Sequence, residues 1–319
     1  TICNTDNQYI VPTSGNPLRG LIQDHVASAV KLTCKDTFLD KAKFQQLVYI
    51  AVSGLAGTEI VAPTEDIILP PPAILKPKPM WTGKQVITAL LANLCRPPLP
   101  PLQLDSKART PPTAFGPDQG EHEVLIRSGE LLTGVLDKNA IGNVSMGLIH
   151  SVYELYGADW AGKLLNAFGR LMTYHLQTAG QSCGISDLVL TSTADAEREE
   201  LLKAVNSANR DGLVDFLQQN GLDVKMDNSR SPTEIDKLLR HHMALYLASD
   251  RKNGKVKLDG AIQGVLNKSA SNVIKACLPN GLQVPFLQNN FSMMVLTGAK
   301  GSSVNQSQIG CFLGQQALE

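Results

Sequence analysis

The sequence lacks the features that would reveal its chemistry from composition alone. Lysines and arginines number 29, and aspartates and glutamates also number 29, so the net charge is zero and no overall field favours nucleic acid as a ligand. The six cysteines form no C-x-x-C pair, which excludes a zinc ribbon within this chain and fits reduced thiols. No apolar run approaches the length of a membrane span. Any indication of function therefore lies in local motifs.

Motifs for nucleotide phosphates and for metals are also absent. A P-loop requires G-x-x-x-x-G-K-S/T, and the glycine-flanked Lys300 is followed by Gly301 instead. The run Glu-His-Glu at 121–123 has no second histidine four residues on, so the H-E-x-x-H zinc motif fails and we expect a solvated loop there. The adjacent histidines at 241 and 242 would point to different faces of a helix. The sequence therefore predicts no metal site in this chain.

The turn around Lys300 is the first stretch with an unusual pattern. Gly298 and Gly301 flank the lysine, and glycines let the backbone turn sharply and bring the ammonium close to whatever lies opposite. Ser303 lies three residues before Gln306, the spacing of a capping box, which predicts a helix that begins there. The helical period then predicts a largely apolar face that carries two amides, formed by Val304, Gln308, Phe312 and Gln315. The residues alone leave two interpretations open: a turn before a core helix whose amides bond to backbone, or a turn that presents a lysine to a ligand.

Prolines dominate two earlier stretches. Between residues 62 and 79 they predict extended chain, which leads into residues 74–85 (ILKPKPMWTGKQ) and then into a helix over 84–93 that begins after Thr82. A linker that carries a proline-recognition peptide is the alternative for this stretch. Residues 96–120 predict a surface loop or a disordered insertion.

The remaining pattern is mixed at first and mainly helical later. A capped helix is predicted over 44–52, a strand pair around a tight turn over 124–138, and helices from residue 146 with breaks near Gly157 and Gly162. His175 falls on an apolar stripe, which favours a satisfied core histidine over a ligand. Further helices are predicted over 194–219 and 232–249. The fold class is therefore α+β.

Several separate blocks of the chain resemble the largest subunit of multisubunit DNA-directed RNA polymerases. Residues 74–85 are similar to the pore segment of the eukaryotic members, and residues 295–302 (VLTGAKGS) resemble the family's Gly-Ala-Lys-Gly-Ser segment. Residues 129–138 (GELLTGVLDK) look like the end of the pore domain. The other blocks are residues 23–24, 183–187 and 275–282. The resemblance covers essentially the whole chain in the family's order.

Three sequence blocks indicate which polymerase class within the family the chain resembles. Residues 129–138, 275–282 and 295–302 resemble the polymerase I class most. The polymerase II or III largest subunit is the alternative within the family, and a non-enzymatic helical scaffold that reuses the fold is the alternative outside it. Since the chain begins at Thr1 and ends inside a predicted helix, we expect an internal piece of a longer subunit.

The resemblance implies a domain order and a place in a larger enzyme. The tail of the active-site domain would occupy residues 1–19, a mixed pore domain residues 20–150, and a mainly helical, incomplete funnel domain residues 151–319. In the family these domains line the secondary channel, through which nucleoside triphosphates enter and backtracked RNA leaves. Nucleotidyl transfer there uses two Mg²⁺ ions on an aspartate-rich loop. No such loop occurs in this sequence, so we expect the Mg²⁺ ligands outside it and no metal bound by this chain.

The resemblance also implies partners and roles for single residues. The partners would be the second-largest and other polymerase subunits, DNA template, RNA, nucleoside triphosphates and a transcript-cleavage factor or subunit, in the nucleus and nucleolus and without a membrane. We expect the nucleotide path to include Lys300, Ser302 and Lys84, the bridge helix to be supported by Asn305, Gln308 and Gln315, and the active site to be framed by Gln23 and Asp24. The residues alone also allow Lys84 to be a solvated surface lysine and Asp24 to cap a helix that begins at His25.

Overall fold

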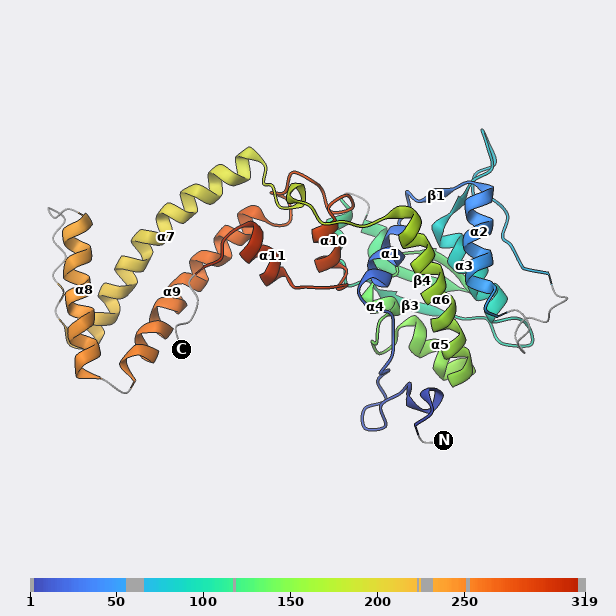
Figure 1. Ribbon diagram of the computed structural model, residues 1–319, viewed down its shortest axis with the longest axis horizontal. Helices are drawn as coiled ribbons and strands as arrows, with labels where there is room; N and C mark the ends of the chain where they lie inside the picture. The colour runs from blue at the N-terminus through green and yellow to red at the C-terminus, as the bar shows by residue number, and fades with distance from the viewer. Residues whose placement is uncertain are drawn as a thin grey trace. The chain divides into compact units, whose positions relative to one another are not determined.

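The computed structural model describes residues 3–55, 66–116, 119–222, 224, 232–250 and 253–314 (Figure 1). The chain divides into two compact units, which we call unit 1 (Thr1–Asp187 with Phe286–Ser303) and unit 2 (Leu188–Pro285 with Val304–Glu319). Unit 1 mixes helices with small sheets, and the α+β class is confirmed. The predicted boundary after residue 150 lies inside a helix of unit 1, and the pore and funnel assignments stay predictions.

Unit 1 is organised around α6 (Ala158–Ala179), which packs most extensively on three other helices. These are α1 (Asp24–Thr33), α2 (Lys41–Val52) and α5 (Leu148–Tyr156). The predicted break at Gly157 is present, because this glycine has φ +93° between α5 and α6, but the break predicted at Gly162 is wrong and α6 continues through it. Burial of Ala161 and Leu164 on either side outweighs the ~1 kcal/mol that a mid-helix glycine costs.

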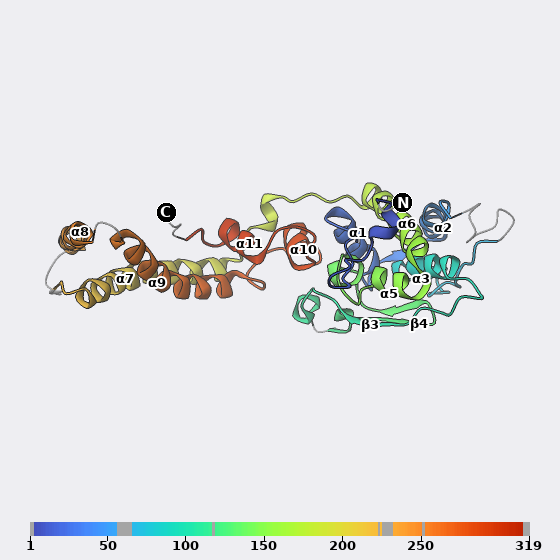
Figure 2. The ribbon, with the colours of Figure 1, turned by 90° about the horizontal axis from the view of Figure 1, so that it is seen from below.

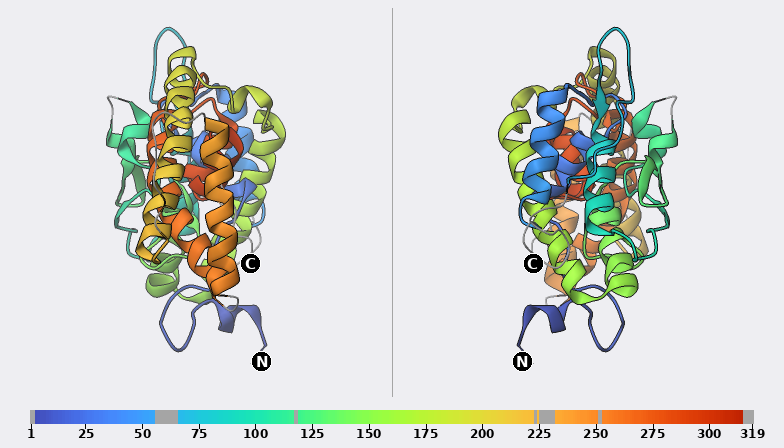
Figure 3. Two further views of the ribbon diagram at one scale, coloured as in Figure 1. Left: turned by 90° about the vertical axis from the view of Figure 1, so that its left-hand side faces the viewer. Right: turned by 90° about the vertical axis from the view of Figure 1, so that its right-hand side faces the viewer.

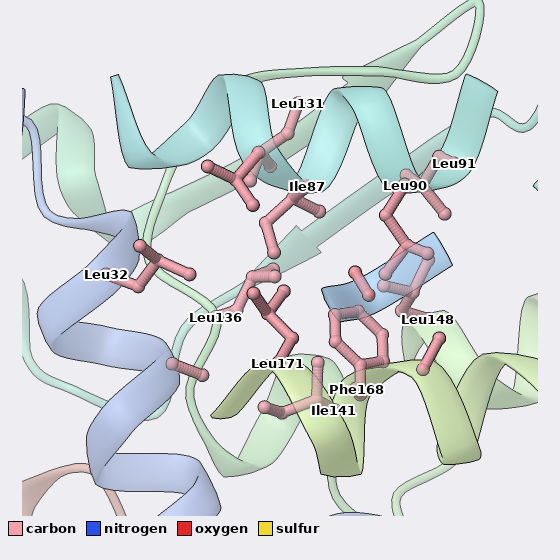
Figure 4. Packing of buried hydrophobic residues seen from close by; sticks show 14 of the residues in the cluster. Leu32, Ile87, Leu90, Leu91, Leu131, Leu136, Ile141, Leu148, Phe168 and Leu171 are labelled. Carbon is pink, nitrogen blue, oxygen red and sulfur yellow. The ribbon is translucent and has the colours of Figure 1, made fainter. Parts of the chain in front are cut away.

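The hydrophobic core of unit 1 lies between α6, α1 and α3 (Gly83–Leu94). Figure 4 shows Leu32 from α1, Ile87 from α3 and Phe168 from α6 converging around Leu136, and all four are fully buried. Full burial of each such side chain is worth roughly 1.5–3 kcal/mol. This core fixes the connecting segments that carry the candidate site.

Two small antiparallel sheets flank α3. The first pairs β1 (Phe38–Leu39) with β2 (Trp81–Thr82), and the second has the order β3 (Leu104–Lys107), β4 (Glu123–Arg127), β5 (Glu130–Thr133). Figure 3 (right) shows α3 between the three-stranded sheet and α2. The prediction of a surface loop over 96–120 is therefore wrong for its middle part. Leu102 and Leu104 alternate with exposed residues and bury on the core, which makes a strand there despite the surrounding prolines.

Short helices complete unit 1, and side chains cap the starts of two of its longer helices. Thr82 and Gln85 form a full capping box on α3, and Asp40 accepts a hydrogen bond from the Lys43 amide at the start of α2. The cap predicted at Asp24 is wrong: α1 already begins at Asp24, and Gln23 occupies the cap position without a side-chain hydrogen bond. The short elements are η1 (Thr5–Gln8), η2 (Pro112–Phe115), η3 (Gln119–His122), α4 (Lys138–Ile141), η4 (Ile185–Asp187) and α10 (Asn290–Leu296).

Unit 2 consists of helices. The long α7 (Ser192–Gln219) and α9 (Gly254–Cys277) lie side by side (Figures 1 and 2), with α8 (Pro232–Ser249) packed on both and α11 (Ser303–Gly310) near the end of the chain. A Cβ on Gly212 of α7 would lie 2.7 Å from Val265 Cγ2 of α9, so this glycine permits the close approach. Among the described residues no helix is both long and apolar enough to span a membrane.

Candidate functional site

The turn after α10 presents Lys300 at its exposed tip. The α10 helix is closed by the Thr297 hydroxyl, which donates to the Met293 carbonyl oxygen over 2.7 Å, and the Lys300 amide donates to the Met294 carbonyl oxygen over 3.0 Å. Gly298 and Gly301 adopt φ of +78° and +80°, a region in which side chains with a Cβ are strained. The predicted sharp turn is thus a hydrogen-bonded structure with a fixed position for the lysine backbone.

Two further cations lie beside this turn. The Lys138 amide donates to the Thr297 carbonyl oxygen over 3.2 Å, which joins the start of α4 to the turn. A Cβ on Gly298 would lie 2.8 Å from Arg109 Cδ and 3.1 Å from Lys138 Cδ, so both long side chains run across this glycine. We call Arg109, Lys138 and Lys300 the cationic cluster. Three segments that are distant in the sequence supply it.

Asp137 fixes the backbone from which the cluster projects. Its buried Oδ2 accepts hydrogen bonds from the Thr110 amide (2.8 Å) and the Thr110 hydroxyl (3.1 Å), while Oδ1 accepts from the Asn139 amide (2.9 Å) and caps α4. Burial raises the pKa of this carboxyl, and the Thr110 and Asn139 hydrogen bonds oppose that rise. The carboxylate therefore ties the residue after Arg109 to the residue before Lys138.

The charge of the cationic cluster is not neutralised within the described part of unit 1. Arg109 and Lys300 are exposed and Lys138 is half-buried. None of the three makes an ion pair with a described acidic residue, and Asp137 directs its oxygens to Thr110 and α4. A concentration of positive charge without a protein counter-charge attracts anions. The arrangement therefore offers positive charge to an anionic ligand, of which a phosphate group is one kind.

Lys84 does not contribute a free charge to this site. It is 8% exposed, and its Nζ lies 2.9 Å from Glu121 Oε1, 3.0 Å from Glu121 Oε2 and 2.5 Å from the Thr33 carbonyl oxygen. The expectations of a solvated Lys84 and of a solvated loop at 121–123 are both wrong. Gly83 explains the burial, because a Cβ there would lie 1.8 Å from the Leu32 carbonyl oxygen; the start of α3 is pressed against the end of α1.

The helix α11 begins at Ser303 as predicted, but its buried face differs from the prediction. Gln306 and Ser307 are buried, Asn305 is exposed, and Gln308 is half-buried. The helix ends at Gly310, so Phe312 follows it, and Gln315 lies outside the described residues. Gln308 lines a hollow of about 400 Å³ in unit 2, together with Phe312 and residues of α9. The amide that is buried at the start of α11 is therefore that of Gln306 and not that of Gln308.

Gln23 and Asp24 are exposed at the entry to α1. Gln23 has φ +50° and ψ −118°, a conformation that costs of the order of 1–3 kcal/mol for a residue with a side chain. The surroundings impose it: the Leu21 amide donates to the Ile141 carbonyl oxygen, and a Cβ on Gly20 would lie 2.2 Å from the Gly142 carbonyl carbon. The Gln23–Asp24 corner is therefore held rigidly, next to the short helix α4 that also carries Lys138.

His175 confirms the expectation of a core histidine. It is buried on α6, and its Nδ1 lies 3.0 Å from the Ser28 hydroxyl of α1. Burial lowers its pKa to about 4, with smaller contributions from the positive charges of Lys31 and Lys43. Among the residues that the structure describes, no group of three or more histidine, cysteine, aspartate or glutamate side chains is arranged to hold a metal ion.

The comparison with known proteins decides the family. A family model described as RNA polymerase Rpb1, domain 3, matches residues 8–188, and one described as RNA polymerase Rpb1, domain 4, matches residues 249–319. The chain belongs to the Rpb1 family of RNA polymerase largest subunits. This confirms the resemblance drawn from the sequence blocks, and members of the Rpb1 family match along the whole chain.

Within the Rpb1 family, two polymerase I subunits have a higher identity to this chain than a polymerase II subunit has. The DNA-directed RNA polymerase I subunit rpa1 of Schizosaccharomyces pombe is 42% identical over 100% of this chain and 18% of its own length. The corresponding subunit RPA190 of Saccharomyces cerevisiae is 38% identical with the same coverage. The polymerase II subunit RPB1-A of Trypanosoma brucei brucei is 29% identical over 97% of this chain and 14% of its own length. The chain thus spans less than a fifth of these relatives.

Some residues of the candidate site were missed by sequence reasoning. Lys138 lies in a block that carries the family resemblance, but no pattern in the block assigns it to the Lys300 turn. Arg109 follows β3, and the prolines on both sides of this strand prevented its prediction. Asp137 forms no recognised motif with its neighbours in the sequence. Contacts between residues almost 200 positions apart bring them together.

Proposed function

We propose that the chain is part of the catalytic subunit of a DNA-directed RNA polymerase I and lines the route by which nucleoside triphosphates reach the active site. The observation that carries this proposal is the cationic cluster, which lies uncompensated in a member of the Rpb1 family. Lys300 faces the triphosphate of the incoming nucleotide, and Ser302 continues the same exposed turn.

The electrostatics of the turn fit a polyanionic substrate. A triphosphate carries several negative charges, and cations that are not paired within the protein attract it without first breaking internal ion pairs. Lysine acts as a mobile point charge, so Lys300 suits a substrate that passes through and is not held in one pose. The Mg²⁺ ions that nucleotidyl transfer requires belong in this proposal to residues outside the chain.

The same proposal includes the domain assignments, further residue roles, the partners and the location. Residues 1–19, 20–150 and 151–319 are assigned to the tail of the active-site domain, the pore and the funnel. Gln23 and Asp24 frame the active site, and Asn305 and Gln308 support the bridge helix. The partners are the second-largest and other polymerase subunits, template DNA, RNA and a transcript-cleavage factor or subunit. The working location is the nucleus, within it the nucleolus.

The test replaces Lys300 in the assembled polymerase. We expect Lys300→Ala to raise the KM for nucleoside triphosphates about tenfold, the change produced by a loss of about 1.4 kcal/mol of binding. Lys41→Ala is the matched control, since Lys41 is an exposed lysine of unit 1 at the start of α2. Unchanged KM and kcat in the Lys300 variant, or an equal change in both variants, would overturn the proposal.

A further inference from the structure

We propose that Arg109 is a second phosphate-binding residue of the Lys300 turn, held in place by Asp137 and Gly298. The inference rests on the proposed function, because it concerns the same substrate at the same site. It adds a residue from the proline-rich segment, which no sequence pattern connects with nucleotide binding. The ligand is the triphosphate of a nucleoside triphosphate.

The backbone on both sides of Arg109 is fixed. The Ala108 amide donates to the His122 carbonyl oxygen over 2.8 Å, and His122 Nδ1 lies 2.9 Å from the Thr110 carbonyl oxygen. Thr110 is fully buried and donates through its amide and its hydroxyl to Asp137. The segment thus has little freedom to move away from the turn, although the Arg109 side chain itself is exposed.

The Arg109 guanidinium lies over the turn, and no ion pair with a described carboxylate accounts for its position there. A Cβ on Gly298 would lie 2.8 Å from Arg109 Cδ and 3.1 Å from Arg109 Nε. Among the residues that the structure describes, no carboxylate forms an ion pair with Arg109. An arginine that served only to tie segments together would donate to a carboxylate or a carbonyl oxygen, as Arg198 does with Asp195 and the Cys311 carbonyl oxygen in unit 2.

The chemistry of arginine complements that of the two lysines. Its planar guanidinium offers five N–H donors and binds two phosphate oxygens at once, whereas lysine offers a point charge. Lys138 and Lys300 therefore supply attraction, and Arg109 supplies orientation of one phosphate group. Asp137 assists through the backbone only, and we class it as a positioning residue.

The first experiment compares Arg109 with a neighbouring cation in the assembled polymerase. We expect Arg109→Ala to raise the KM for nucleoside triphosphates about tenfold, the effect of about 1.4 kcal/mol, and to weaken inhibition by tripolyphosphate by a similar factor. Arg109→Lys should recover part of the loss, since it keeps the charge but not the fork. Lys107→Ala is the control: Lys107 is exposed on β3 two residues away, and its loss changes the net charge equally.

The outcomes separate this inference from the proposed function. Equal KM values for Arg109→Ala and Lys107→Ala, with Lys300→Ala still impaired, would overturn the role of Arg109 and leave the proposed function standing. A normal KM in Lys300→Ala would overturn the proposed function itself. If Arg109→Ala altered only cleavage of backtracked RNA and left nucleotide use unchanged, the residue would bind RNA phosphates and the triphosphate assignment would be wrong.

A pair of glycines provides a second test. Gly298 and Gly301 share the left-handed backbone conformation, but only a Cβ at 298 would collide with Arg109; at 301 the nearest side-chain atom is Val295 Cγ2, 3.6 Å away. Gly298→Ala should therefore raise the KM more than Gly301→Ala, while thermal denaturation shows similar losses of stability from the shared backbone strain. Equal KM values in the two variants would contradict the placement of Arg109 over the turn.

Discussion

Two lysines of unit 1 begin from similar sequence settings and end in opposite environments. Lys84 follows a glycine at the start of α3, and Lys300 stands between two glycines after α10. Lys84 is buried, and the Glu121 carboxylate and the Thr33 carbonyl oxygen surround its ammonium. Lys300 is exposed on a hydrogen-bonded turn beside Arg109 and Lys138. The first charge is compensated within the fold, and the second is available to a ligand.

The difference shows that local sequence does not separate a structural cation from a functional one. A buried ion pair must recover the cost of removing two charges from water, so its geometry is close and its atoms are saturated with hydrogen bonds. A ligand-binding cation must remain unsaturated until the ligand arrives. The number of carboxylate and carbonyl oxygens around each ammonium therefore distinguishes the two roles, and that number comes from tertiary structure.

The largest effect is expected from breaking the Lys84 pair. Lys84→Met should lower the free energy of unfolding by roughly 3–5 kcal/mol, because it leaves the Glu121 carboxylate buried without a counter-charge. Chemical denaturation of the chain measures this. The double variant Lys84→Met with Glu121→Leu should regain most of the loss. A single variant as stable as the parent chain would mean that Lys84 and Glu121 are not buried together, and the comparison would fail.

An intermediate effect is expected from His175, a group buried without any counter-charge. Burial lowers its pKa to about 4, whereas the unfolded chain takes up a proton near the ordinary value of 6.5. The contribution of His175 to the free energy of unfolding is therefore fully present above pH 6.5. It is lost as the pH falls towards 4, by up to about 3 kcal/mol. His175→Gln should remove this part of the pH dependence in denaturation experiments. His241→Gln on the exposed surface of α8 should leave it in place.

Much of the fold could be predicted from local patterns. The capping box at Thr82 and Gln85, the Asp40 cap and the glycine break at 157 act within a few residues, so the sequence contains all the information that they need. The inward residues of α8 also follow from the helical period, and they lie in a common cluster: Ile235, Leu238, Leu239, Met243 and Tyr246. The family could be inferred because its motif blocks are contiguous.

The errors arise where distant contacts override local preference. Residues 96–120 contain a strand, β3, because it pairs with β4, with Leu104 opposite Ile126. No local pattern around residues 96–120 includes that partner strand. Lys84 is buried because the Glu121 carboxylate lies beside its ammonium. Glu121 is 37 positions away in sequence, so no local pattern includes it. The cationic cluster joins positions 109, 138 and 300 for the same reason. A sequence pattern can indicate a turn that presents a lysine, but the cations beside it depend on tertiary packing.

The smallest effect on stability is expected at Lys300, and it sharpens the comparison most. Lys300→Ala should change the free energy of unfolding by no more than about 0.5 kcal/mol, as is usual for surface substitutions that leave caps and buried pairs intact. The variant also removes a positive charge from a turn over which the Arg109 and Lys138 side chains run, so any gain in stability from lower repulsion should shrink as salt is added. Urea denaturation at low and high salt measures both quantities. A loss as large as that of Lys84→Met would reveal a hidden counter-charge, and the lysine would then be structural after all.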